Sequence, residues 1–169
     1  VVDNRLHRAH AMPPNVVPPV PVFPRPLVQQ VIQLRLSQHC RPPASTRTHH
    51  NPTRSALDAA PAIVISEGYA TADTLSQALD APVVAAFDSG NLSKVAQVLH
   101  ERYPHKPIVI AGDDDFTQES VNGINPGREK AIEAAKLANG VAVFPTFAPD
   151  EQVSLKLSDF NDLANKSTL

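Results

Sequence analysis

Three consecutive carboxylates form the most unusual local feature of this 169-residue sequence. They are Asp113, Asp114 and Asp115, and they directly follow the apolar run Pro107–Gly112 (PIVIAG). Adjacent negative charges repel one another and add nothing to a hydrophobic core. Such a run is either a solvated turn or a cation-binding site, and its position after an apolar segment favours a cation-binding site.

The segments around this run predict an α/β fold. Short β-branched apolar runs at 61–66, 81–87, 107–112 and 141–147 have the composition of buried strands. Amphipathic stretches at 68–80, 91–103 and 125–140 alternate with them, and Val98 is among the residues of 91–103 that we expect to face the core. Asn91 and Asn125 are plausible N-caps. Strands that alternate with helices imply a mainly parallel four-stranded sheet with helices on both faces.

The carboxyl ends of parallel strands meet at one edge of a sheet, where ligands of such folds collect. Glu67 follows the first expected strand, and the three aspartates follow the third. Alternation along an extended chain sends Asp113 and Asp115 to one side and Asp114 to the other. Glu67, Asp113 and Asp115 are therefore the candidate catalytic and metal-binding residues, and Mg²⁺ or Mn²⁺ is the expected cofactor because hard ions prefer carboxylate oxygens.

Four blocks of the sequence together resemble the Toprim domain of plasmid- and phage-type DNA primases. They are ISEGYATADTL (65–75), PVVAAFDSGNL (82–92), PIVIAGDDD (107–115) and NPGREKA (125–131). The similarity covers about residues 56–165 and implies a Toprim-like, Rossmann-like domain. By this resemblance Glu67 is the acid of the first motif, Asp113 and Asp115 are the metal-binding pair, and LSDFNDL (157–163) supplies Asp159 and Asp162 as further metal ligands.

The resemblance implies the catalytic domain of a DNA primase. Such an enzyme synthesises short primers on a DNA template by divalent-metal-dependent nucleotidyl transfer from nucleoside triphosphates, in plasmid, phage or conjugative replication. Arg128 and Lys130, near the start of one expected helix, and Lys94, near the start of another, are candidate phosphate contacts. We expect further primase or helicase domains beyond this chain, and little primer synthesis by the chain alone.

Other functions remain open at this stage. A Toprim nuclease or topoisomerase-like enzyme would use the same acids, although a topoisomerase needs a nucleophilic tyrosine and both Tyr69 and Tyr103 fall near expected core positions of helices. A phosphoacceptor signalling domain also places acids at strand ends, but it requires paired acids after its first strand. A docking module whose acids have no chemical role is a further alternative.

Composition divides the chain at about residue 55. Residues 1–55 hold seven arginines, no lysine, one acid and ten of the seventeen prolines, which gives a net charge of +6, whereas residues 56–169 carry −8. We interpret 1–55 as a poorly structured segment, either a non-native leader or a linker from a preceding domain, with a short helix at 27–36, and 56–169 as the Toprim domain. The single cysteine, Cys40, and the lack of a long apolar run favour a cytoplasmic protein without a membrane segment.

Overall fold

The computed structural model describes residues 30, 32 and 52–166 of the chain. Most of the expected leader, including Cys40, lies outside these residues, and the division at residue 55 stays a prediction. Gln30 and Ile32, which belong to the expected helix 27–36, both have helical backbone, and Ile32 is buried. Within the described residues, no helix combines the length and apolar character that a membrane span requires.

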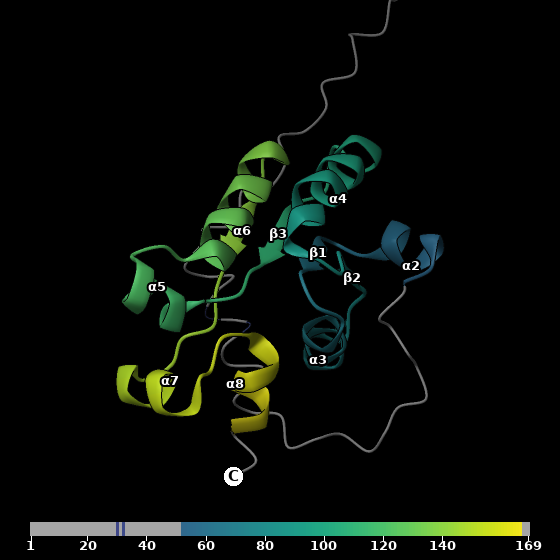
Figure 1. The fold of residues 1–169 in the computed structure, drawn as a ribbon. Coiled ribbons are helices and arrows are strands. Elements are labelled where there is room, and N and C mark those ends of the chain that lie inside the picture. Colours follow the sequence, from purple (N-terminus) through teal and green to yellow (C-terminus); the bar gives the residue numbers. More distant parts are fainter. Residues whose placement is uncertain (1–29, 31, 33–51, 167–169) are drawn as a thin grey trace, which may run out of the picture.

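The core is a four-stranded parallel sheet in the order β2-β1-β3-β4 (Figure 1). The strands are β1 (Ile63–Ser66), β2 (Val83–Ala85), β3 (Ile108–Ala111) and β4 (Val141–Val143). They lie inside the four expected runs, so the predicted α/β architecture is confirmed. Two of the runs were predicted too long: the expected strand 81–87 ends at Ala85, and the expected strand 141–147 ends at Val143.

Helices cover both faces of this sheet (Figure 1). Helices α4 (Ser89–Arg102) and α6 (Pro126–Leu137) pack side by side on one face, and α3 (Tyr69–Leu79) and α8 (Phe160–Lys166) pack on the other. Three further helices within residues 52–166 are short: α2 (Arg54–Ala59), α5 (Phe116–Asn122) and α7 (Pro149–Leu155).

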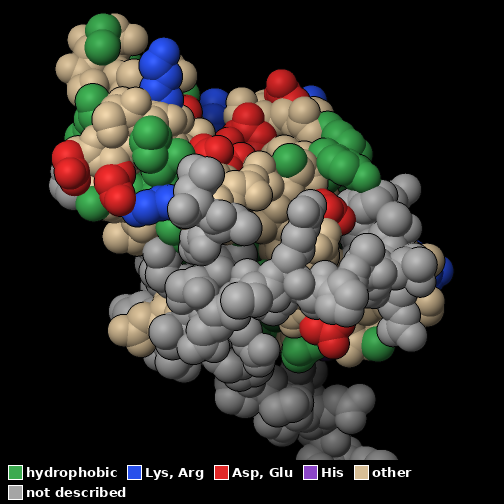
Figure 2. All heavy atoms as spheres, turned by 90° about the horizontal axis from the view of Figure 1, so that it is seen from below, with side chains coloured by type: hydrophobic (Ala, Val, Ile, Leu, Met, Phe, Trp, Pro, Cys, Tyr) green, Lys and Arg blue, Asp and Glu red, His purple; other side chains and the backbone are tan. Residues whose placement is uncertain are grey.

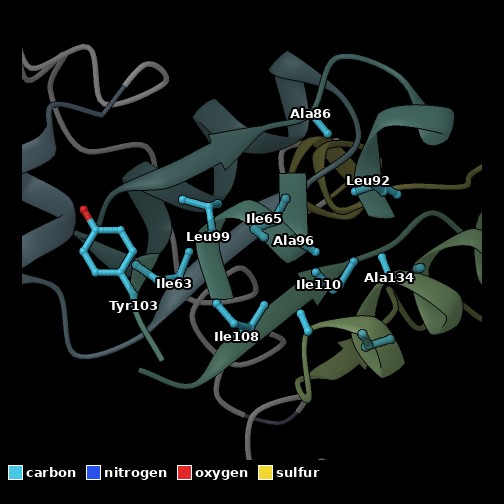
Figure 3. Close-up of a cluster of buried hydrophobic side chains, with 14 of the residues drawn as sticks. Ile63, Ile65, Ala86, Leu92, Ala96, Leu99, Tyr103, Ile108, Ile110 and Ala134 are labelled. Carbon is cyan, nitrogen blue, oxygen red and sulfur yellow. The ribbon is translucent and has the colours of Figure 1, made fainter. Parts of the chain in front are cut away.

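Alternation along the strands explains why both faces of the sheet are buried. Ile63 and Ile65 point into the cluster beneath α4 and α6, whereas Val64 points into the cluster beneath α3 and α8. The same division holds for β3. Figure 3 shows the first cluster, in which isoleucines from β1 and β3 meet small and aliphatic side chains of the two helices.

Two details of α4 differ from the sequence-based expectation. Asp88, rather than Asn91, is the N-cap, and its Oδ1 accepts a hydrogen bond from the Gly90 N–H at 2.7 Å. Asn91 instead donates to the Ala86 carbonyl from within the first turn. Val98 was expected to face the core but is 60 % exposed. By contrast, Asn125 caps α6 as expected, accepting from the Arg128 N–H at 3.1 Å.

Candidate metal centre

The register of the sheet brings the predicted acids to one edge. Ser66 at the end of β1 is paired with Ala111 at the end of β3. Glu67 and the loop that starts at Gly112 therefore leave the sheet side by side. Viewed from below, acidic side chains gather near the middle of the face (Figure 2).

Asp113 has the most perturbed carboxyl group of the site. Its pKa is raised from the ordinary value of 3.8 to about 7, first by burial and then by the negative charges around it. In order of effect, these charges belong to Glu67, Asp159, Asp115 and Asp162. All five carboxylates that the sequence predicted as metal ligands are therefore close enough to interact electrostatically.

Glu67 shares this environment. Burial is the first cause that raises its pKa, followed by the charges of Asp115 and Asp88, while a hydrogen bond from the Ser89 N–H opposes the shift. The carboxylate thus lies against the first residue of α4. Glu67 is held between the carboxyl end of β1 and the start of α4, at the same edge as Asp113.

Asp114 points away from the other acids, as alternation predicted, and is only 5 % exposed. Arg128 donates to both of its carboxylate oxygens, from Nε at 2.7 Å and from Nη2 at 2.9 Å. Although burial alone would raise the pKa of Asp114, hydrogen bonds from Arg128, Gln152 and Asn125 offset burial and lower it. Asp114 is thus a buried anchor of the loop.

Arg128 is positioned from two sides, since its guanidinium also lies 4.8 Å from the centre of the Phe144 ring. Asn125 completes the anchor by donating to Asp114 Oδ1 at 2.8 Å and accepting from the Asp115 N–H at 3.0 Å. This network was not predicted from the sequence. Its signal was the Asn125-x-x-Arg128 spacing, which places both side chains at one helix start.

The N-terminus of α6 approaches the acidic loop very closely. The Gly127 N–H donates to Asp115 Oδ2 at 2.9 Å, and a Cβ atom on Gly127 would lie 2.7 Å from the Asp113 carbonyl oxygen. Gly127 therefore permits an approach of the two segments that a residue with a Cβ atom would obstruct. Gly68 at the start of α3 has no such close neighbour, because the nearest atom to a Cβ there would be Thr71 Oγ1 at 4.0 Å.

Asp159 and Asp162 form a reciprocal cap at the start of α8. Asp159 Oδ1 accepts from the Asp162 N–H at 2.7 Å, and Asp162 Oδ2 accepts from the N–H groups of Ser158 and Asp159 at 2.8 and 3.3 Å. Thr71 donates to Asp159 Oδ2 at 2.9 Å and so ties α8 to α3. The pair therefore stabilises the start of α8, at the edge of the acid cluster formed by Glu67, Asp113 and Asp115.

The three predicted phosphate contacts differ in their surroundings. Arg128 is engaged with Asp114, whereas Lys130 is exposed and pairs with Glu133 at 3.2 Å. Lys94 is exposed on α4. The two tyrosines also differ: Tyr103 is buried as expected, but Tyr69 is 46 % exposed, so the expectation for Tyr69 was wrong.

The donor set fits a hard divalent cation. All the candidate ligands are carboxylates, and Asp113 Oδ1 is buried without a hydrogen-bond partner. A buried, unpaired carboxylate oxygen among other acids is stabilised by a positive charge. Across the described part of the chain, no three such side chains already stand in a metal-holding arrangement, so binding would require their side chains to adjust.

A parallel sheet with carboxylates at the ends of two neighbouring strands defines the class of protein: an α/β domain with an acidic site at the carboxyl ends of its strands. The chain belongs to the Toprim domain family, whose family model matches residues 62–168.

Two curated relatives give a closer comparison. Two proteins named DNA primase TraC, both from Escherichia coli, are 62 % and 58 % identical to the chain over 96 residues, or 57 % of its length. These matches span only 9 % and 7 % of the relatives' own lengths. No solved structure matches the chain.

Proposed function

We propose that this chain is the catalytic Toprim domain of a DNA primase and joins nucleotides on a DNA template. The observation that carries this proposal is the group of carboxylates around the buried, unpaired Asp113 Oδ1. The similarity to relatives named DNA primase supports primer synthesis over other uses of such a site. A role in the replication of a plasmid, phage or conjugative element is part of the same proposal.

We assign Glu67, Asp113 and Asp115 as the residues that hold Mg²⁺ or Mn²⁺. Divalent ions bound there would supply positive charge for the attacking and leaving oxygens during phosphoryl transfer. Asp159 and Asp162 are assigned as outer contributors, because backbone amides already use several of their lone pairs. Their negative charge still strengthens the attraction of the site for a cation.

In nucleotidyl transfer a 3′-hydroxyl attacks the α-phosphate of a nucleoside triphosphate, the bond to pyrophosphate breaks, and the hydroxyl proton must leave. Glu67 is the residue that we assign to accept this proton, because it lies at the carboxyl end of β1 beside Asp113 and Asp115. Asp114 and Arg128 hold the loop that carries Asp113 in place. Lys94 and Lys130 are both exposed, and we assign them to bind phosphate oxygens, Lys130 by exchanging its surface pairing with Glu133.

A domain exchange tests the proposed function. In one of the E. coli DNA primase TraC proteins, the matching 96 residues would be replaced by the corresponding residues of this chain. We expect the chimera to synthesise primers on single-stranded DNA, and we expect Glu67→Gln and Asp113→Asn versions to lose synthesis while remaining folded. A folded chimera that binds Mn²⁺ but makes no primer would refute primase function. Metal-dependent nicking of supercoiled DNA by that chimera would favour a nuclease instead.

A further inference from the structure

Phe87 is an exposed aromatic residue with an unusual backbone conformation. It follows β2 by two residues, its φ angle is 66°, and it is 71 % exposed. Bulky side chains rarely adopt a positive φ, which normally belongs to glycine, asparagine or aspartate. The conformation and exposure together place a phenyl ring in solvent, where it contributes nothing to the core.

The position of Phe87 links it to the acid site. On one side of it, the Ala86 N–H donates to the Ser66 carbonyl at 2.9 Å, directly before Glu67. On the other side, Phe87 is followed directly by Asp88, the N-cap of α4, whose negative charge helps to raise the pKa of Glu67. Phe87 therefore belongs to the short turn that leaves β2 beside the Glu67 segment, at the edge of the sheet that carries the acids.

We propose that the Phe87 ring stacks against a nucleobase while the phosphate groups of the same ligand lie at the acid site. This proposal rests on the proposed function and names the part of the ligand that the turn would bind. The base could belong to a nucleoside triphosphate or to single-stranded DNA, and both present the same flat π surface. Base–aromatic stacking suits this site because it tolerates any base sequence and needs no positive charge, which the acid cluster lacks.

The whole 169-residue chain contains no tryptophan, which allows a direct measurement. In the Phe87→Trp variant the single indole replaces the phenyl ring, and stacking of a base quenches its fluorescence. The matched control is Val98→Trp, because Val98 is also exposed, at 60 %, but lies in the interior of α4 rather than in the turn. Thymidine triphosphate and oligothymidylate, each titrated in Mn²⁺ buffer at low ionic strength, are the probes.

We expect saturable quenching of Phe87→Trp and no saturable quenching of Val98→Trp. Saturation with thymidine triphosphate alone would identify an incoming nucleotide, and saturation with the oligonucleotide would identify a DNA strand. Both results support the proposal. Absence of saturable quenching at position 87 with both probes, or equal quenching of both variants, would overturn it.

A second set of variants separates stacking from general hydrophobic contact. Phe87→Tyr should retain affinity for whichever probe quenches the indole of Phe87→Trp. Phe87→Leu and Phe87→Ala should bind the same probe roughly 5- to 100-fold more weakly. Equal affinity of the leucine and tyrosine variants would contradict stacking. Mn²⁺ binding, measured by electron paramagnetic resonance, should be unchanged in all of them. If Phe87→Trp binds Mn²⁺ but shows no quenching, only the stacking proposal is rejected. If the unmodified chain does not bind Mn²⁺, the proposed function is rejected.

Discussion

Asp113→Asn should make the metal-free protein more stable and at the same time abolish its binding of metal. The substitution keeps the shape of the side chain and removes its charge. In the folded protein the pKa of Asp113 is about 7, against an ordinary value of 3.8. Above pH 7 the ionised carboxylate is therefore unfavourable, by about 4 kcal/mol at 1.36 kcal/mol for each pKa unit.

The direction of the pH dependence follows from the raised pKa. The folded state holds the proton of Asp113 more tightly than the unfolded state does. Its stabilising contribution is complete below about pH 4 and is lost as the pH rises through about 7. The free energy of unfolding of Asp113→Asn should therefore equal that of the parent near pH 4 and exceed it by about 2–4 kcal/mol at pH 8.

Urea unfolding followed by circular dichroism, at several pH values without divalent ions, measures this difference. Asp80→Asn is the matched control, because Asp80 is exposed at the end of α3 and has a left-handed backbone that asparagine also tolerates. It should show no such pH-dependent gain. Saturating Mn²⁺ should stabilise the parent, by about 2.7 kcal/mol at one hundred times Kd, and leave Asp113→Asn unchanged. A destabilised Asp113→Asn at pH 8, or one with parental Mn²⁺ affinity, would refute the reasoning.

Three further predictions concern the framework of the site. Arg128→Lys loses the two-point contact with Asp114, so we expect about 1–2 kcal/mol less stability and weaker Mn²⁺ binding; parental values in urea unfolding and in the Mn²⁺ titration would contradict this. Gly127→Ala places a Cβ atom 2.7 Å from the Asp113 carbonyl oxygen, so the free energy of unfolding should fall by about 1–3 kcal/mol and Mn²⁺ affinity should decrease. Unchanged Mn²⁺ affinity would contradict this, because it would show that the loop adjusts freely. Lys106→Met removes an ammonium group that donates to three carbonyls at the end of α2 at 2.6–2.7 Å, so the free energy of urea unfolding should fall by about 2–3 kcal/mol while Mn²⁺ affinity stays unchanged. A change in Mn²⁺ affinity would contradict a purely structural role.

The sheet and its main helices were predictable because their signals are local. Strands such as Ile63–Ser66 are buried on both faces, so every side chain is small or apolar and the run is easy to recognise. Helix α6 carries Asn125 as its cap and Pro126 in its first turn, which mark its start in the sequence. Helix α5 was missed because none of its seven residues is buried, and it therefore has no apolar periodicity.

The ends of the strands depended on packing that local sequence does not reveal. Beyond Ala85 the chain leaves the sheet, and Phe87 adopts a positive φ, although an aromatic residue after an apolar run favours a strand. Beyond Val143, Phe144 leaves the ladder and lies beneath the Arg128 guanidinium. Both differences arise at the edge that holds the site.

The acids of the candidate site could be predicted from the sequence, but the contacts that hold the acidic loop in place could not. Glu67 and Asp113 follow neighbouring strands, so the topology alone places them together. The burial of Asp114 depends on Arg128 from α6 and Gln152 from α7, which come together only in the tertiary structure. A run of three aspartates gives no indication that its middle member forms an ion pair.

A crystal structure of the chain soaked in Mn²⁺ tests the central claim most directly. Anomalous scattering locates the ion independently of any assumption about the site. We predict a peak bound by Asp113 together with Glu67 or Asp115. A peak bound only by exposed acids elsewhere, or no peak at saturating Mn²⁺, would contradict the account.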